Sequence, residues 1–112
     1  WVVSSTLIAV DKTKDLMIGI IDIRHELNDF LFSYGGHIGY GVRPSERRKG
    51  YATKILHLGL AFCKTINLKK VMLACYKDNV ASGKTIMKNG GVLKREFTHT
   101  DGKTVQVEWI TL

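Results

Sequence analysis

The sequence predicts an α+β fold: a mixed, mostly antiparallel β-sheet with a central parallel β-α-β crossover and two helices. Three observations lead to this prediction. Apolar and polar residues alternate on both sides of short polar segments, as they do in β-hairpins. The segment Thr53–Ile66 has apolar residues at helical spacing. Because it stands between two apolar runs, it predicts a right-handed crossover between parallel strands.

The first part of the chain is rich in β-forming residues. Two apolar runs, Val2–Val10 and Met17–Arg24, are separated by the polar segment Asp11–Asp15, and we expect them to form a hairpin. The longest irregular connection follows over His25–Gly36 and ends at two glycines. Another strand is expected over His37–Val42, immediately before the long helix.

The second part of the chain contains the other predicted helix and hairpin. A continuous apolar run, Val71–Cys75, is typical of a strand that is buried on both faces. The second helix is expected over Val80–Lys88, because Asn89 and two glycines follow it. Val92–Thr98 and Thr104–Leu112 alternate by twos around an Asp-Gly pair, which is a strong hairpin signal.

Composition indicates one domain that covers residues 1–112, with 45% hydrophobic and 24% charged residues. No apolar run approaches the ~18 residues of a membrane span, and no signal peptide is recognisable, so we expect no membrane partner. Cys63 and Cys75 have neither a disulfide framework nor metal spacing, which favours reduced thiols in a cytoplasmic protein. The four histidines are scattered, and we expect no metal site.

The net charge is +7 at pH 7. A solvated basic surface and a nucleic-acid partner would both account for it. The chain contains no recognisable RNA- or DNA-binding motif, so we do not expect nucleic acid to be the partner. A strongly anionic small ligand would use part of this charge locally.

The basic turn, Val42–Ala52, is the segment that points most directly to such a ligand. It lies between a predicted strand and a predicted helix. The N-terminus of a helix carries unpaired N–H donors and roughly half a positive charge. Three consecutive basic residues precede Gly50, which lets the backbone come close to a ligand. The turn therefore predicts a binding site for a phosphorylated ligand.

The basic turn resembles the Q/R-x-x-G-x-G/A signature of the GNAT superfamily of acetyltransferases, which use acetyl-coenzyme A. Arg47, Gly50 and Ala52 fill its three specified positions. The strand that leads into the turn, Ile38–Pro44, is also similar to the corresponding strand of the family.

A second family element is similar to the segment Asn79–Gly91, in which Asn79, Ser82 and Gly90 match in register. The resemblance extends from about Met17 to Phe97. It implies that the chain is an N-acetyltransferase with a GNAT-like fold. It also implies that the coenzyme lies in a splayed gap between the strands His37–Val42 and Val71–Cys75.

The resemblance implies a set of residues that contact the coenzyme. The backbone N–H of Val42 would lie near the thioester carbonyl, the basic turn would hold the pyrophosphate, and the second helix would face the pantetheine arm. Lys84 would add positive charge. These residues are Val42, Arg47, Arg48, Lys49, Gly50, Tyr51, Ala52, Asn79, Ser82 and Lys84.

His37 and Tyr40 are the candidate catalytic residues. His37 stands where many relatives have a glutamate that acts as a base, and histidine titrates near neutral pH. Tyr40 lies in the strand that would flank the thioester. The alternatives are an ordinary hydrogen-bonded histidine, a tyrosine that packs in a strand, and a water chain that removes the proton. Asn79 would also serve as a helix cap.

Two departures from the family pattern limit what the resemblance implies. Ile86 replaces the tyrosine that is often the general acid, and Gly91 replaces a phenylalanine. The first strand and first two helices of the family have no counterpart here, so we expect an N-terminally truncated domain. The acceptor would be a small-molecule or peptide amine, and a homodimer is compatible with the sequence. The alternative function is a non-catalytic, regulatory module that binds coenzyme A.

Overall fold

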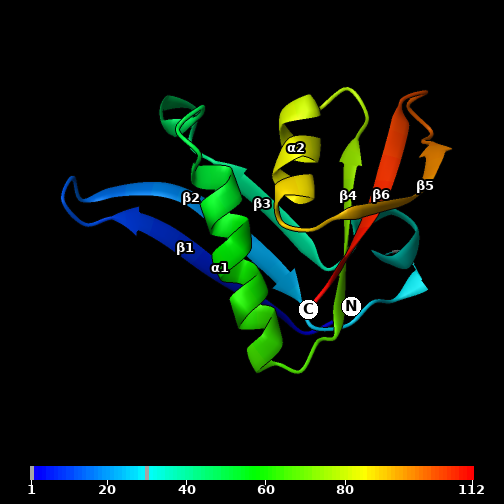
Figure 1. The fold of residues 1–112 in the computed structure, drawn as a ribbon, viewed down its shortest axis with the longest axis horizontal. Coiled ribbons are helices and arrows are strands. Elements are labelled where there is room, and N and C mark those ends of the chain that lie inside the picture. Colours follow the sequence, from blue (N-terminus) through cyan, green and yellow to red (C-terminus); the bar gives the residue numbers. More distant parts are fainter. Residues whose placement is uncertain (1, 30) are drawn as a thin grey trace.

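The structure is a computed structural model that describes residues 2–29 and 31–112; Trp1 and Phe30 lie outside the described residues. In the described part, six strands form two three-stranded antiparallel sheets (Figure 1). Sheet A has the order β1 (Ser4–Asp11), β2 (Leu16–Arg24) and β3 (Ile38–Val42). Sheet B has the order β4 (Lys70–Tyr76), β6 (Thr104–Thr111) and β5 (Val92–Thr98). The two α-helices are α1 (Tyr51–Thr65) and α2 (Val80–Lys88).

Both predicted hairpins are confirmed, and local chemistry explains each turn. Between β1 and β2, the carboxylate of Asp11 accepts a hydrogen bond from the main-chain N–H of Thr13 at 2.9 Å. Between β5 and β6, Gly102 has φ +82°, a left-handed conformation that glycine adopts without strain. The carboxylate of Asp101 accepts a bond from the N–H of Lys103 at 2.9 Å in the same turn. The polar residues between the strands therefore satisfy the turn backbone themselves.

Helix α1 packs one apolar stripe against sheet A, as its spacing predicts. Gly59 faces Ile21 of β2 so closely that a β-carbon at this position would collide with the isoleucine side chain. Burial of each large apolar side chain contributes about 1.5–3 kcal/mol. The buried residues of this stripe are Ile55, Leu56, Gly59, Leu60 and Cys63.

The sheets meet at one point and then separate. Gly36 forms an isolated bridge with Leu73, and the N–H of His37 donates to the carbonyl oxygen of Met72 at 2.8 Å. Gly36 has φ +71°, and a β-carbon there would lie 2.5 Å from the Met72 oxygen, so only glycine fits this junction. In Figure 1, β3 starts beside the middle of β4, and the two strands diverge from there toward their C-terminal ends.

The predicted single mixed sheet with parallel pairing across α1 is not confirmed. In residues 2–29 and 31–112, no main-chain hydrogen bond joins β3 to β4 beyond His37. The reason is local: the bonds to Met72 are made before β3 begins, and farther along the Tyr40 side chain crosses from β3 to α2. The edge of each strand is therefore left unpaired where the strands diverge.

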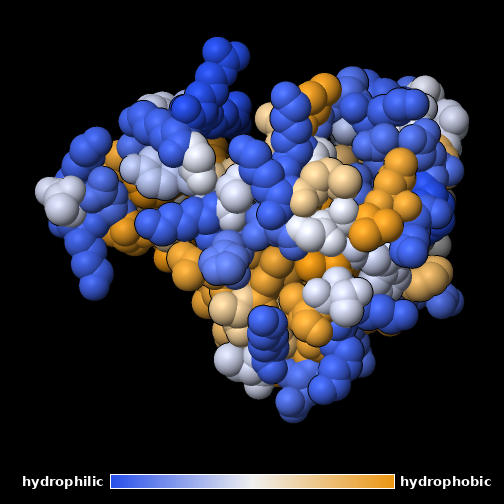
Figure 2. Space-filling model, in the orientation of Figure 1, coloured by the Kyte–Doolittle hydropathy of each residue, from blue (hydrophilic) through white to orange (hydrophobic). Residues whose placement is uncertain are grey.

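Hydrophobic side chains also lie on the surface of the arm formed by β1 and β2. Figure 2 shows hydrophobic residues along the lower border of this arm, whereas hydrophilic residues cover most of the remaining face. In the described residues, no helix is both long enough and apolar enough to cross a membrane. The exposed hydrophobic residues of the arm are Leu7, Ile8, Val10, Met17 and Ile20.

Candidate functional site

The basic turn before α1 presents unpaired main-chain donors. Gly50 is the N-cap of α1 with φ +82°, and no side chain caps the helix. Arg48 is also left-handed, with φ +63°, which is uncommon for a residue other than glycine. Left-handed residues within such a turn direct successive N–H groups into a concavity that suits an anion. The first turn of α1 contains no acidic residue that would repel one.

The basic side chains of this turn have different surroundings. The Nε of Arg47 donates to the carbonyl oxygen of Val42 at 3.3 Å, and Arg48 is exposed. Lys49 is paired with Glu46, with 3.0 Å between Nζ and Oε2. Glu46 is only 4% exposed, and in the described residues its Oε1 has no hydrogen-bond partner. Lys49 is therefore less available to a ligand than the two arginines, which the sequence did not indicate.

The free edge of β3 faces the gap between the sheets. At its two ends, β3 is bonded to β2 through the main chain of His37 and of Arg43, each at 2.7 Å. Hydrogen-bonded positions alternate along an antiparallel pair. The N–H and C=O groups of Tyr40 and Val42 therefore point away from β2. The C=O of Val42 already accepts a hydrogen bond from Arg47. The N–H and C=O of Tyr40 and the N–H of Val42 therefore form the edge to which an extended ligand could add its own amide groups.

Tyr40 bridges the gap to α2. Its hydroxyl lies 2.8 Å from the Oγ of Ser82. Burial raises the pKa of Tyr40, and the hydrogen bond between Tyr40 and Ser82 partly offsets this rise. The structure thus brings together one predicted catalytic residue and one predicted coenzyme-binding residue. The phenol at this position keeps its proton at neutral pH and can donate it.

Two further side chains extend this polar cluster into the protein. The thiol of Cys75 donates to the carboxylate of Glu108, with Sγ 3.7 Å from Oε1. Burial, followed by the charge of Glu108, raises the pKa of Cys75 to about 11. Glu108 is 2% exposed, and burial raises its own pKa. Glu108 is not among the site residues that the sequence predicts, although Ile110, two residues later on the same face of the strand, indicates a buried position.

Helix α2 begins with the N-cap residue that the sequence predicts. Asn79 caps α2, because its side chain accepts a hydrogen bond from the N–H of Ser82 at 3.2 Å. Lys84 is exposed on the second turn. Ile86, at the position of the family tyrosine, is fully buried and packs in the core. Helix α2 itself therefore supplies no proton donor at this position.

His37 lies where the two sheets meet. Its Nδ1 accepts a hydrogen bond from the main-chain N–H of Met72 at 2.9 Å, and its ring packs edge-on against Trp109 at 6.2 Å between centroids. His37 is 6% exposed, and burial lowers its pKa. A ring nitrogen that accepts this bond cannot accept a proton from an amine at the same time. The geometry therefore favours a structural role over the predicted role as a base.

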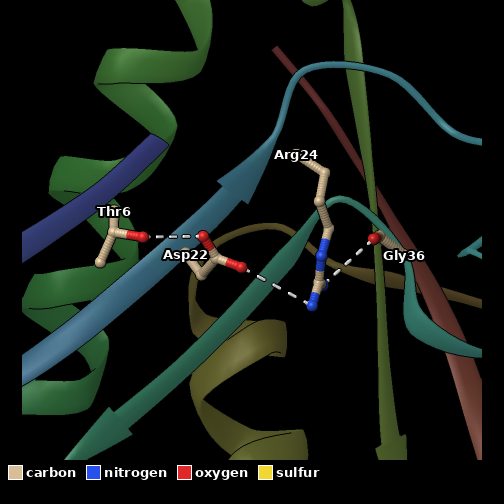
Figure 3. A network of polar contacts seen from close by, with 4 residues as sticks. All are labelled: Thr6, Asp22, Arg24 and Gly36. Atoms are coloured by element: carbon tan, nitrogen blue, oxygen red, sulfur yellow. Dashed lines mark hydrogen bonds and ion pairs between the residues drawn. The ribbon is translucent and has the colours of Figure 1, made fainter. Parts of the chain in front are cut away.

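A second polar network lies beside this junction (Figure 3). Thr6 donates to the carboxylate of Asp22 at 3.0 Å, and Arg24 lies 3.8 Å from the other oxygen of that carboxylate. Arg24 also donates to the carbonyl oxygen of Gly36 at 3.4 Å. These contacts link β1 and β2 to the turn that precedes β3. It borders a hollow of about 590 Å³.

The comparisons with known proteins agree with this geometry. Residues 1–92 match the family model described as the acetyltransferase (GNAT) domain. The match covers most of the chain, and the chain therefore belongs to the GNAT family of acetyltransferases. No curated protein gives a significant match.

Solved structures of other acetyltransferases have the same fold. A mutant of the spermidine N-acetyltransferase from Vibrio cholerae matches with a TM-score of 0.80 and 18% identity, over 96% of this chain and 65% of that one. The ribosomal-protein-S5-alanine acetyltransferase from Vibrio fischeri matches with a TM-score of 0.81 and 19% identity, over 96% of this chain and 61% of that one. The chain thus spans less than two thirds of the length of either protein. At these identities the likeness establishes the fold.

Proposed function

We propose that this protein is an N-acetyltransferase that moves the acetyl group of acetyl-coenzyme A to a primary amine. The observation that carries the proposal is the hydrogen bond between Tyr40 and Ser82, which lies beside the unpaired edge of β3. It places two hydroxyl groups in the gap between the sheets, next to α2. The concave basic turn at the start of α1 supports it. Family membership supports the general reaction, and the acceptor is a small-molecule or peptide amine.

The coenzyme fits the chemistry of the described residues. The left-handed turn and the side chains of Arg47 and Arg48 would hold the pyrophosphate, with a smaller contribution from Lys49 because of Glu46. The edge of β3 would pair with the amides of the pantetheine arm, and the N–H of Val42 would polarise the thioester carbonyl. The remaining contacts are proposed for Tyr51, Ala52, Asn79, Ser82 and Lys84.

Tyr40 can account for the proton balance of the reaction without a separate base. The neutral amine attacks the thioester carbon, a C–N bond forms, and the C–S bond breaks. Tyr40 gives its proton to the departing sulfur and takes the proton that the attacking nitrogen must lose. One hydroxyl group thus serves as acid and then as base, and no net proton is left over. This assignment replaces the role that the sequence suggested for His37.

The decisive experiment measures thiol release from acetyl-coenzyme A with a panel of amines. The panel includes spermidine and an alanine peptide, because the names of the two structurally similar proteins mention spermidine and an alanine of ribosomal protein S5. Tyr40→Phe should lower turnover by about 10²–10⁴-fold and leave the affinity for coenzyme A nearly unchanged.

Tyr76→Phe is the matched control, because the Tyr76 hydroxyl is exposed and bonds to Asp101 in the β5–β6 turn. Its turnover should equal that of the wild type. Binding of coenzyme A without thiol release with any amine would favour the alternative, a non-catalytic regulatory module. The buried Ile86 is the observation that keeps this alternative in view.

The free thiols of Cys63 and Cys75 are compatible with a reducing compartment such as the cytoplasm. Burial raises the pKa of Cys63 to about 11, so it stays protonated and unreactive at neutral pH. Sedimentation of the purified chain would test whether it forms a homodimer.

A further inference from the structure

Two glycines leave one face of β3 bare. Side chains alternate along a strand, and Tyr40 and Val42 pack on the side of the core, so Gly39 and Gly41 lie on the opposite face of sheet A. A β-carbon at Gly41 would have no described atom within 4 Å, and one at Gly39 would meet only the guanidinium of Arg24, at 3.8 and 3.9 Å. An open strip, called the trough below, therefore runs over β3 from Arg24 to Val42.

The trough meets the hollow of about 590 Å³ at Arg24. The guanidinium of Arg24 lies next to Gly39, and the same residue lines the hollow together with Asp22 and Asn28. The side-chain oxygen of Asn28 accepts a hydrogen bond from the N–H of Leu31 at 2.9 Å, which leaves its amide nitrogen to donate. A ligand that extends from the trough into the hollow would therefore meet a cation and an amide donor.

Arg24 has hydrogen-bonding capacity that the protein does not use. In the described residues its guanidinium makes one hydrogen bond, to the Gly36 oxygen at 3.4 Å, and its contact with Asp22 is longer, at 3.8 Å (Figure 3). The Arg24 side chain is 27% exposed, so a ligand can reach the remaining N–H donors. By contrast, one oxygen of Asp22 accepts from Thr6 and the other faces Arg24. The free binding capacity of this pair is therefore that of a donor.

We propose that Arg24 binds a carboxylate group of the acceptor while the amine of the same molecule lies at the other end of the trough, beside Val42. A guanidinium matches a carboxylate through two parallel hydrogen bonds. Asp22 holds the guanidinium in place, and its negative charge disfavours a doubly charged phosphate at the same position. This inference rests on the proposed function, in which the N–H of Val42 marks the position of the thioester.

The length of the trough sets the size of the acceptor. Gly39, which lies next to the guanidinium, is three residues from Val42 on β3. At ~3.3 Å per residue of a strand, the amine and the carboxylate should be about 10 Å apart. An extended peptide covers this distance with about three residues. The acceptor class is therefore a short peptide, or a molecule of similar length, that has an amine at one end and a carboxylate at the other.

The first arm of the test compares trialanine with its C-terminal amide, which has the same amine but lacks the carboxylate. In thiol release, the wild type should favour the free acid by roughly 10–100-fold in kcat/KM. Arg24→Gln should bring this ratio close to one, and Arg24→Lys should give an intermediate ratio because it keeps the charge without the fork. Both peptides meet the same fraction of folded enzyme, so partial unfolding of a variant does not change the ratio.

Lys14→Gln is the matched control, because it removes the same charge from an exposed position in the β1–β2 turn. Its ratio should equal that of the wild type. In the wild type, the preference for the free acid over the amide should be greatest for alanine peptides of about three residues. Gly41→Val fills the trough and should lower kcat/KM for both forms of trialanine, whereas the thermal shift with coenzyme A should persist.

The second arm needs no chemistry. Trialanine and its amide are titrated by calorimetry into the protein saturated with coenzyme A, and the free acid should bind more tightly to the wild type but not to Arg24→Gln. If the acid binds preferentially but no amine is acetylated, the carboxylate site stands and the proposed function fails. If amines are acetylated without a preference for the free acid, the proposed function stands and the inference is overturned. Faster turnover of spermidine that is lost in Asp22→Asn would also overturn it, because the pair would then bind a cation.

Discussion

His37 joins the two sheets through both its main chain and its ring. Its N–H donates to the Met72 oxygen, and its Nδ1 accepts from the Met72 N–H. This pair of hydrogen bonds between His37 and Met72 is called the clasp below. The clasp requires a neutral ring, because a protonated Nδ1 is a donor and has no lone pair for the Met72 N–H. The Nδ1 atom, which would otherwise be able to accept a proton from an amine, is thus engaged in a hydrogen bond that holds the fold together.

The clasp predicts a pH dependence of stability. Burial lowers the pKa of His37, so the unfolded state takes up a proton first as pH falls below the ordinary value of 6.5. The contribution of His37 is therefore complete above that pH and is lost as pH falls through the lowered, folded-state pKa. Denaturant unfolding of the wild type should show this loss, whereas His37→Asn, which keeps an acceptor but does not titrate, should show a smaller one.

Activity measurements on the same variant decide between the two roles of His37. If the histidine is structural, folded His37→Asn should retain most of its turnover. A loss of about 10²–10⁴-fold in a folded variant would instead restore the role as a base. Equal pH slopes in the wild type and His37→Asn would contradict the clasp as the source of the pH dependence.

The basic turn supports a prediction about individual cations. Arg47→Ala and Arg48→Ala should each weaken binding of coenzyme A by about 1–3 kcal/mol, because charge-assisted bonds to phosphate are lost. The loss should shrink as salt rises. Lys49→Ala should weaken binding less than either, since Lys49 is already paired with Glu46. Calorimetry at two salt concentrations measures all three, and a dominant Lys49 effect would contradict the pairing.

At the scale of elements, the junction of β3 with β4 depends on a glycine. Gly36 is left-handed and touches the main chain of Met72, and the strands on either side belong to different sheets. A side chain there would force the turn to move and would separate His37 from its partner. The gap between the sheets therefore has a fixed width at its base.

This junction can be tested with two glycines of adjacent segments. Gly36→Ala should lower the free energy of unfolding by about 2–5 kcal/mol, from backbone strain and contact with Met72. Gly41→Ala, on β3 itself, has no atom within 4 Å of the new β-carbon and should be neutral or slightly stabilising. Chemical denaturation measures both. Similar losses in the two variants would mean that strand propensity, and not the junction, is responsible.

At the scale of the whole molecule, binding and folding are linked. A ligand that binds only the folded state stabilises it by about 2.7 kcal/mol at 100 times its dissociation constant. Coenzyme A should therefore raise the melting temperature of the chain. Gly50→Val should abolish this increase, because the left-handed backbone of the turn is strained by a β-branched residue.

Gly102→Val provides the control for that experiment. Gly102 also has φ +82° with open space around it, but it lies in the β5–β6 turn. Both variants should lose similar stability without ligand, and only Gly102→Val should retain the shift with coenzyme A. Retention of the shift in Gly50→Val would reject the basic turn as the pyrophosphate site.

The helices and hairpins could be predicted from the sequence because they depend on neighbours in the chain. The spacing of Ile55, Leu56 and Cys63 predicts one buried face of α1, and the Asp-Gly pair at Asp101 predicts a tight turn; the structure confirms both. The basic turn could also be predicted from the sequence, since Gly50 and the helix that follows it are contiguous in the chain. Family membership was also within reach, because its motifs are short and local.

Only the tertiary structure decided how the two sheets meet and what lies between them. Gly36 and His37 are far from Met72 in the chain, and the sequence pattern of β3 and β4 fits one continuous sheet as well as two sheets that diverge. Glu108 is 2% exposed, although its charged side chain favours exposure and only Ile110, two residues later on the same strand face, indicates burial. Burial and unpaired strand edges result from contacts between distant segments, which periodicity along one segment does not specify.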